Sequence, residues 1–308
     1  MDKIPNFFIV GFPRSGTTSM HFYLKQHPDI FMPEFKEPIY FCKDLVKESI
    51  NFHKKKYISS YHITTTEKEY LKIFKKRKNE KAVGEASGWY FYSKVAAKEI
   101  KKYNPNAKII FLIREPTELL FSLHHQYLYS GNETIKNFEK ALNSENLRKK
   151  GKKINKNIPW PSLLYYSEFI KYKNHIEKFT KIFPKNQIKL VLFDDIKSNT
   201  KKVYNDLLNF LEVDPKFTPD FTVKHGCKTE RFQIPYKTTL KKIFTNYFPK
   251  SLNYLLAKIL AKINTKYIKR PVMNKNLRSR LKKKFKKEVI ELQKLLNRDL
   301  IKLWNYDE

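Results

Sequence analysis

The chain has 308 residues, and 41% of them are hydrophobic, so it is long enough to bury a substantial core. It contains no uncharged apolar run of about 18 residues, which argues against a transmembrane helix. Its N-terminus shows neither a basic region nor a cleavage site, which argues against a signal peptide. The two cysteines neither require a disulfide nor form a metal site. We therefore expect a globular, cytoplasmic protein.

The formal net charge of +33 indicates attraction to polyanions such as nucleic acid, anionic lipid, acidic glycans or nucleotides. Most of the excess is lysine, in a chain also rich in isoleucine and asparagine, and A+T-biased coding explains such a composition as well. Charge alone therefore does not identify a partner. We expect neither nucleic acid nor an obligate protein partner, and we keep peripheral contact with an anionic membrane as an open alternative.

Alternating strand and helix patterns run through the first two thirds of the chain. The strands are expected as apolar runs at 6–11, 82–85, 108–114 and 187–193. The helices are expected at 16–27, 66–76, 93–103, 117–129, 162–183 and 199–212. This alternation predicts an α/β fold with a central parallel sheet flanked by helices and connected by right-handed crossovers.

The character of the sequence changes after about residue 220. A basic loop is expected at 224–231, a helix-prone basic region at 237–270, and one long amphipathic helix at 277–304. We expect a single domain, residues 1–308, in which 1–220 form the α/β core and 221–308 a basic loop and a helical extension.

The segment 11–18 reads Gly-Phe-Pro-Arg-Ser-Gly-Thr-Thr and lies between the first expected strand and the first expected helix. Its glycine spacing is that of a phosphate-binding loop. P-loop nucleotidases carry lysine after the second glycine, but here that residue is Thr17, and the nearest cation is Arg14. The loop therefore predicts a backbone cradle for a nucleotide with a single 5′-side phosphate group.

A second candidate site follows the strongest strand. Arg114 is placed at its carboxyl end, where open α/β sheets bind ligands, and a guanidinium can grip a ribose phosphate at two points. Ser122 follows about two helical turns later, near the same expected nucleotide. The alternative is that Arg114 merely pairs with Glu115 or Asp194.

Three blocks of the chain resemble sulfotransferases that use 3′-phosphoadenosine 5′-phosphosulfate (PAPS). Residues 11–18 are similar to the family's 5′-phosphosulfate loop, and residues 108–122 to its 3′-phosphate block, with Arg114 and Ser122 at the family's spacing. Residues 36–41 resemble the segment of glycan-type sulfotransferases in which a glutamate precedes an aromatic pair. With two shorter matches the resemblance covers roughly residues 6–213.

The resemblance implies a P-loop-like sulfotransferase fold, PAPS as the cofactor, and direct in-line transfer of a sulfuryl group to a hydroxyl or amine of a saccharide or glycolipid. It implies Glu37 as the catalytic base and Arg14 as the cation that stabilises the departing 3′,5′-bisphosphate. The implied cofactor-binding residues are Pro13, Arg14, Ser15, Gly16, Thr17, Thr18, Arg114, Ser122, Lys224 and Lys228.

Elementary chemistry supports these roles. A cation beside the bridging oxygen stabilises the charge that develops there in the transition state. Apolar neighbours raise the pKa of a carboxylate such as Glu37 toward a useful value. Simpler interpretations stay open: Arg14 as a surface arginine, Thr18 as a helix N-cap, and Glu37 in a salt bridge with Lys36 or another lysine.

Several positions depart from the family pattern. In several glycan sulfotransferases the block that matches 84–87 carries a lysine that touches the sulfate, but this chain has Ala86 there, so Lys224 or Lys228 is the expected replacement. Glu85 is either a second carboxylate near the acceptor or a turn cap. Phenol and steroid sulfotransferases use a histidine base, which would fall near 90–95, where no histidine stands.

We expect no metal, because His124 and His125 are adjacent and point apart on a helix. One alternative function is a small-molecule kinase, in which Asp194 would have to hold Mg²⁺. Another is a basic protein that coats nucleic acid or a membrane, with the apolar positions of 252–263 in contact with lipid. The acceptor pocket is expected in the loops 42–65, 130–160 and 224–250.

Overall fold

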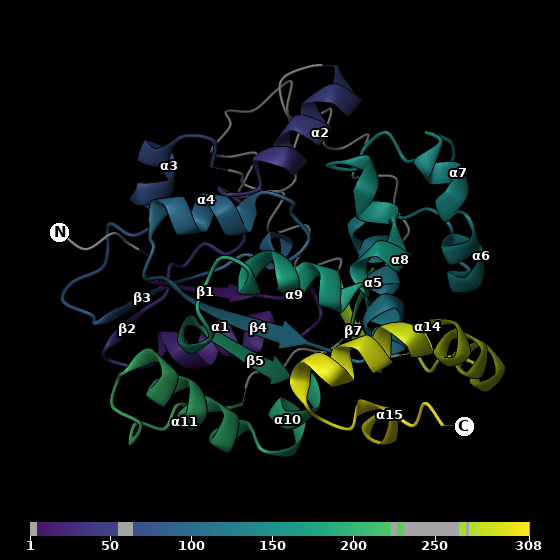
Figure 1. Ribbon diagram of the computed structural model, residues 1–308. Helices are drawn as coiled ribbons and strands as arrows, with labels where there is room; N and C mark the ends of the chain where they lie inside the picture. The colour runs from purple at the N-terminus through teal and green to yellow at the C-terminus, as the bar shows by residue number, and fades with distance from the viewer. Residues whose placement is uncertain (1–4, 55–63, 223–226, 231–264, 269–270, 308) are drawn as a thin grey trace.

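The computed structural model describes residues 5–54, 64–222, 227–230, 265–268 and 271–307 (Figure 1). Five parallel strands form the central sheet in the order β2-β3-β1-β4-β5. Their bounds are β1 Phe7–Val10, β2 Ile30–Phe31, β3 Ala82–Ala86, β4 Lys108–Ile113 and β5 Ile188–Leu192. The predicted α/β fold with a parallel sheet is confirmed, and the two-residue β2 is an addition to the expected strands.

Strand β1 lies at the centre of the sheet, where Phe8 is in register with Glu85 of β3 and Ile109 of β4. All four residues of β1 are buried, because helices cover both faces of the sheet. Since the strands are parallel, the carboxyl ends of β1, β3 and β4 meet at one edge. The segments that follow these three ends carry most of the predicted site residues.

Helices lie on both sides of the sheet, with α1 and α11 on one face and α4 and α9 on the other (Figure 1). The helices of the first half are α1 Thr17–Lys25, α2 Lys43–His53, α3 Glu67–Lys72, α4 Ala96–Tyr103, α5 Pro116–Ser130, α6 Phe138–Asn143 and α7 Glu145–Lys149. Those of the second half are α8 Tyr166–Phe169, α9 Tyr172–Thr180, α10 Phe193–Ser198, α11 Thr200–Leu211, α14 Lys275–Leu296 and α15 Leu300–Leu303. Short 3₁₀ turns are η1 Gly88–Tyr90, η2 Pro161–Leu164 and η3 Lys185–Gln187.

The buried side chains form two clusters that follow the alternation of β1. Phe8 and Val10 belong to the larger cluster, under α4, α5 and α9, whereas Phe7 and Ile9 belong to the cluster under α1 and α11. Both clusters hold β1 in place, so the loop after Val10 leaves a rigid strand.

The helix expected at 162–183 is wrong as one continuous element. The structure has η2, α8 and α9 in its place. The pieces are held in different directions by long-range hydrogen bonds, since the Tyr166 hydroxyl donates to Glu133 at 3.0 Å and the Tyr172 hydroxyl to the carbonyl of Arg114 at 2.5 Å. Such tertiary contacts outweigh the helix propensity of the segment.

The C-terminal expectations also need correction. The helix expected at 277–304 is two helices, because Asn297 adopts a left-handed conformation with φ 48° that ends α14. Residues 227–230, expected as part of a basic loop, form strand β6 (Cys227–Glu230), paired with the antiparallel β7 (Thr265–Ile268), which was expected as helix. Most of 237–270 lies outside the described residues.

Two of the segments expected as loops contain helices. Helix α2 occupies 43–53, within the 42–65 segment, and α6 and α7 occupy 138–149, within the 130–160 segment. The capping pattern explains the second case, because the Asn137 side chain accepts a hydrogen bond from the backbone N–H of Lys140.

Candidate functional site

The loop between β1 and α1 is built by its glycines. Gly16 is the N-cap of α1 and has φ 96°, a conformation that favours glycine. A Cβ at Gly11 would lie 2.5 Å from the carbonyl oxygen of Leu112, so only glycine lets the loop pass so close to β4. The backbone N–H of Ser15 donates to the carbonyl of Phe12 at 3.1 Å and closes the turn.

The loop ends in backbone donors at the start of α1. The first intrahelical bond runs from the N–H of Met20 to the carbonyl of Gly16, so the N–H groups of Thr17, Thr18 and Ser19 have no acceptor within the helix. No side chain caps this end. Orphan N–H groups together with the helix dipole favour an anion, so these residues fit a phosphate group.

The two segments predicted to bind phosphate, residues 11–18 and 108–122, are joined by hydrogen bonds of Arg14. The Arg14 Nε donates to the Ser122 Oγ at 3.0 Å, and an Arg114 guanidinium nitrogen donates to the Arg14 carbonyl at 2.9 Å. Arg14 has φ 80°, a left-handed conformation that is uncommon for a side chain with a Cβ. Residues about one hundred positions apart thus share one hydrogen-bonded cluster.

Arg114 is buried at the carboxyl end of β4, and its guanidinium lies 4.9 Å from the ring centroid of Phe193. It forms an ion pair with Glu118 at 3.3 Å, a partner that the sequence interpretation did not name. Glu115 instead caps α5, accepting from the backbone N–H of Thr117 and Glu118.

Glu37 is half-buried and lies beside the residues that follow β3. It has a left-handed backbone with φ 58°, and its N–H donates to the carbonyl of Ala86 at 3.1 Å. Its Oε2 accepts from the N–H of Gly88 at 2.8 Å, whereas Oε1 has no hydrogen-bond partner among the described residues. Burial raises the pKa of the Glu37 carboxyl, opposed by the charge of Lys36 and by the Gly88 bond.

Lys36 is a functional candidate that the sequence interpretation did not place in the cofactor site. Its Nζ donates to the Thr18 Oγ1 at 2.9 Å, so the ammonium lies at the phosphate-type loop and forms no ion pair with Glu37. Burial lowers the pKa of Lys36. Thr18 is the second residue of α1 rather than its N-cap. The sequence feature that could have indicated Lys36 is its position directly before Glu37, since adjacent residues in an irregular turn can face the same site.

Glu85 is neither near solvent nor a turn cap. It is fully buried in β3, where its Oε2 accepts from the hydroxyls of Tyr70 at 2.6 Å and Tyr90 at 2.9 Å. Burial raises the pKa of Glu85 to about 7. Ala86 points to the opposite face and packs with the cluster that contains Met20.

Two of the buried histidines in the described part of the chain, His21 and His124, have lowered pKa values. Burial lowers the pKa of His21 to about 3 and also lowers the pKa of His124. His124 donates to the carbonyl of Ile135 and His125 to that of Phe121, both at 2.8 Å, so the two rings point to different neighbours. Within the described ranges, no group of three or more histidine, cysteine, aspartate or glutamate side chains could hold a metal.

Two predicted positions cannot be placed. Lys224 lies outside the described residues, and so does the side chain of Lys228, of which the structure describes only the backbone strand. The apolar segment 252–263 also lies outside.

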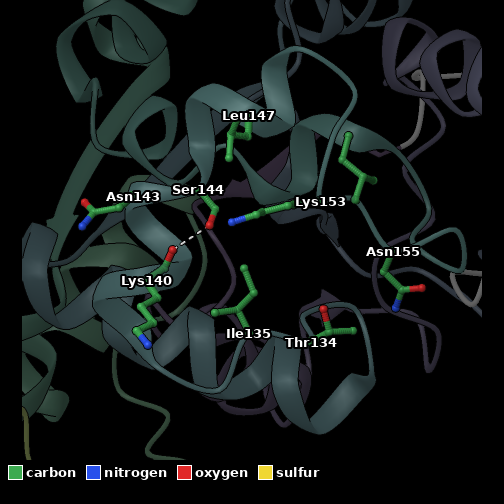
Figure 2. A pocket seen from close by; sticks show the side chains of 9 residues that line it. Thr134, Ile135, Lys140, Asn143, Ser144, Leu147, Lys153 and Asn155 are labelled. Atoms are coloured by element: carbon green, nitrogen blue, oxygen red, sulfur yellow. Dashed lines mark hydrogen bonds between the residues drawn. The ribbon is translucent and has the colours of Figure 1, made fainter.

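A surface cavity of about 600 Å³ lies apart from this cluster, between the end of α5 and the loop after α7 (Figure 2). The Lys153 side chain points into it, toward Ser144 (Figure 2). It is lined by Thr134, Ile135, Lys140, Asn143, Ser144, Leu147, Lys153, Ile154 and Asn155. None of the predicted cofactor or catalytic residues lines the cavity, although it falls in the 130–160 segment expected to contact the acceptor.

Comparison with known proteins points in one direction. A sequence model described as "Sulfotransferase family" matches residues 5–219. The chain is 23% identical to the membrane-associated sulfotransferase kil1 of Dictyostelium discoideum, over 80% of this chain and 64% of that protein. It is 24% identical to the bifunctional heparan sulfate N-deacetylase/N-sulfotransferase 3 of Mus musculus, over 70% of this chain and 23% of that protein.

A human relative, carbohydrate sulfotransferase 15, is 23% identical over 69% of this chain and 44% of its own length. The chain therefore spans between 23% and 64% of the length of these three relatives. Among solved structures, a sulfotransferase from Alicyclobacillus acidocaldarius superposes with a TM-score of 0.71 at 25% identity, over 99% of both chains. In the described part of the chain, no helix is both long and apolar enough to cross a bilayer.

Proposed function

This chain belongs to the sulfotransferase family, and on that premise we propose that it transfers a sulfuryl group from PAPS to a hydroxyl or amine of a saccharide or glycolipid. The observation that carries the proposal is the cluster of Arg14, Arg114 and Ser122 beside the orphan N–H groups of α1. We infer that this cluster provides one anion site for a 5′-phosphate and a second for a 3′-phosphate.

The residues fit this cofactor, which when bound supplies the sulfuryl group for transfer. The α1 N-terminus, with Pro13, Ser15, Gly16 and the hydroxyls of Thr17 and Thr18, would hold the 5′-phosphosulfate. Arg114 and Ser122 would hold the 3′-phosphate. The contact between the Arg114 guanidinium and the Phe193 ring supports this role, because it limits the movement of the guanidinium group.

Glu37 is proposed as the base that takes the proton of the acceptor group. Its Oε2 is held by Gly88, which fixes the carboxylate, and Oε1 is left to accept the proton. Its raised pKa makes the carboxylate a stronger base than an exposed glutamate.

Two cations are proposed to stabilise the charge that develops on the departing group. Arg14 would reach the bridging oxygen from the loop, and Lys36, already at Thr18, would supply the lysine that Ala86 does not provide. Lys36 thereby replaces Lys224 or Lys228 as the preferred candidate for this contact.

The saccharide acceptor is inferred from the relatives, whose names state heparan sulfate and carbohydrate sulfation. We propose a cytoplasmic setting without nucleic acid or an obligate protein partner. Peripheral contact with anionic lipid stays a secondary proposal, tested by sedimentation with vesicles with and without anionic lipid. The kinase alternative is disfavoured because Asp194 is engaged by Trp304 at 2.9 Å and Lys197 at 2.9 Å.

The test is an assay for 3′,5′-ADP formed from PAPS with a panel of saccharide acceptors, each compared with a reaction that lacks acceptor. Acceptor-dependent release supports the proposal. Release of ADP from Mg-ATP with the same acceptors, without release of 3′,5′-ADP from PAPS, would contradict the proposal and indicate a kinase.

A further inference from the structure

One carboxylate lies between two arginines that come from distant parts of the chain. The Glu118 Oε2 contacts Arg114 at 3.3 Å, and the Glu118 Oε1 contacts Arg278 at 2.6 Å. Only the width of a single carboxyl group therefore separates the two guanidinium groups. An anion of similar width with two or more oxygens can take the same place.

This place coincides with the proposed 3′-phosphate site. Glu118 stands in the first turn of α5, four residues after Arg114, which closes β4. Ser122 lies one further turn along the same helix, and its hydroxyl accepts from Arg14. Arg278 therefore reaches this corner from outside the α/β core.

The position of Arg278 is fixed because the C-terminal segment is anchored to the same edge of the sheet. Arg298 makes two bonds to Asp195, at 2.6 and 2.7 Å. The Trp304 indole donates to Asp194 at 2.9 Å, and the Tyr306 hydroxyl to Glu115 at 2.5 Å. Figure 1 shows α14 crossing beside the carboxyl ends of β4 and β5.

The start of α14 is electrostatically unusual. Its first turn contains no acidic residue, and it carries Lys275, Arg278 and Arg280 near the positive end of the helix dipole. Cations there are unfavourable unless an anion lies nearby. Two carboxylates partly provide this negative charge: Glu118 pairs with Arg278, and Glu139 pairs with Arg280.

We propose that Arg278 is a second arginine of the 3′-phosphate site. The Glu118 carboxylate then lies where the 3′-phosphate binds, between Arg114 and Arg278, until the nucleotide displaces it. This inference rests on the proposed function. A phosphate dianion carries more charge and more oxygens than a carboxylate, so it competes well for two guanidinium groups. Glu118 is 27% exposed and can turn toward solvent when it is displaced.

The role of Arg278 is then to select nucleotides that carry a 3′-phosphate. Arg280 is a matched control, since it lies on the same helix and pairs with Glu139 at an exposed position away from Arg114. Calorimetric titration of the full chain with 3′,5′-ADP and with 5′-AMP, for wild type, Arg278→Ala and Arg280→Ala, measures the effect.

Arg278→Ala should weaken binding of 3′,5′-ADP by roughly tenfold to a hundredfold and leave binding of 5′-AMP unchanged. Arg280→Ala should change neither. Unchanged 5′-AMP binding also reports an intact fold, and Arg278→Gln serves as a second variant of similar length if alanine prevents folding.

Wild-type preference for 3′,5′-ADP that survives Arg278→Ala would overturn the inference and leave the proposed function in place. Equal weakening of both nucleotides would also overturn it, because the effect would then be structural. A wild type that does not distinguish the two nucleotides would contradict the proposed function itself.

Discussion

The turn after β2 and the neighbouring strand β3 each carry a glutamate with a raised pKa, yet the two carboxyls have different surroundings. Glu37 lies in the turn before α2, and Glu85 lies at the end of β3. The segments are in contact, because the N–H of Glu37 donates to the carbonyl of Ala86. Their sequences alone do not separate a base from a structural acid.

The two glutamates differ in the groups that their carboxyl oxygens contact and in whether an acceptor molecule can reach them. Glu85 is fully buried and shared by two tyrosine hydroxyls, so no acceptor molecule can reach it without opening the core. Glu37 is half-buried, and one oxygen has no partner among the described residues. A raised pKa therefore identifies a base only when the carboxyl can also be reached.

The largest expected effect concerns Glu37. Glu37→Gln keeps the shape and the Gly88 contact but removes the base, so turnover of PAPS should fall by about 10²- to 10⁴-fold while binding of 3′,5′-ADP stays unchanged. Glu34→Gln is the matched control, because Glu34 is an exposed neighbour paired with Lys25. Steady-state assays and calorimetry measure both quantities, and retained turnover in Glu37→Gln would remove it as the base.

Glu85 should act on stability instead. Its pKa is about 7 in the folded state against 4.5 for the unperturbed group, so the folded state binds the proton more tightly. This stabilisation is present below about pH 4.5 and is lost as pH rises through about 7, a change of up to about 3 kcal/mol.

Glu85→Gln should therefore remove this part of the pH dependence, measured as the free energy of unfolding in denaturant at pH 5 and pH 8. The exposed Glu67→Gln should keep the wild-type dependence. Identical slopes in wild type and Glu85→Gln would show that the carboxyl is not held protonated near neutral pH.

Tyr70→Phe should have a smaller effect of about 1 kcal/mol on the free energy of unfolding, since it removes one of two hydroxyl donors to Glu85. The loss should shrink when Tyr70→Phe is made in the Glu85→Gln background, because the two groups interact. Fully additive losses would contradict the contact.

The most subtle effect concerns Lys36, whose charge lowers the pKa of Glu37. Lys36→Met should therefore raise the pKa of Glu37 and move the acidic limb of the pH profile of kcat/KM to higher pH. Lys25→Met, which removes a lysine near the far end of α1, should leave the limb in place. If the acidic limb of the pH profile stays at the same pH in Lys36→Met and only KM changes, Lys36 acts in cofactor binding and does not influence the pKa of Glu37.

Local patterns predicted the strands and helix starts that hold the candidate residues. The loop at 11–18, the strand before Arg114 and the start of α5 at Pro116 depend on glycine, apolar and proline signals that act within a few residues. Arg114 directly follows β4, and Ser122 lies on α5, which begins two residues after Arg114, so both stay near the carboxyl end of that strand.

Long-range contacts were not predictable in the same way. The partners of Glu85 come from α3 and η1, the ion pair of Arg278 joins residues 160 positions apart, and the break at 165–172 depends on distant hydrogen bonds. A single sequence records none of these pairings, since each partner is an ordinary residue in its own segment. The contact of Lys36 with Thr18 was likewise not predicted, because it requires the turn to fold back on α1.

The central claim is that this site takes a nucleotide with a 3′-phosphate, and thermal denaturation with 3′,5′-ADP, 5′-AMP and Mg-ATP tests it most directly. A ligand at about 100 times its dissociation constant adds roughly 2.7 kcal/mol to the free energy of unfolding. We expect a clear rise in Tm with 3′,5′-ADP and little change with the other two. A rise with Mg-ATP alone, or none with any of the three, would contradict the account.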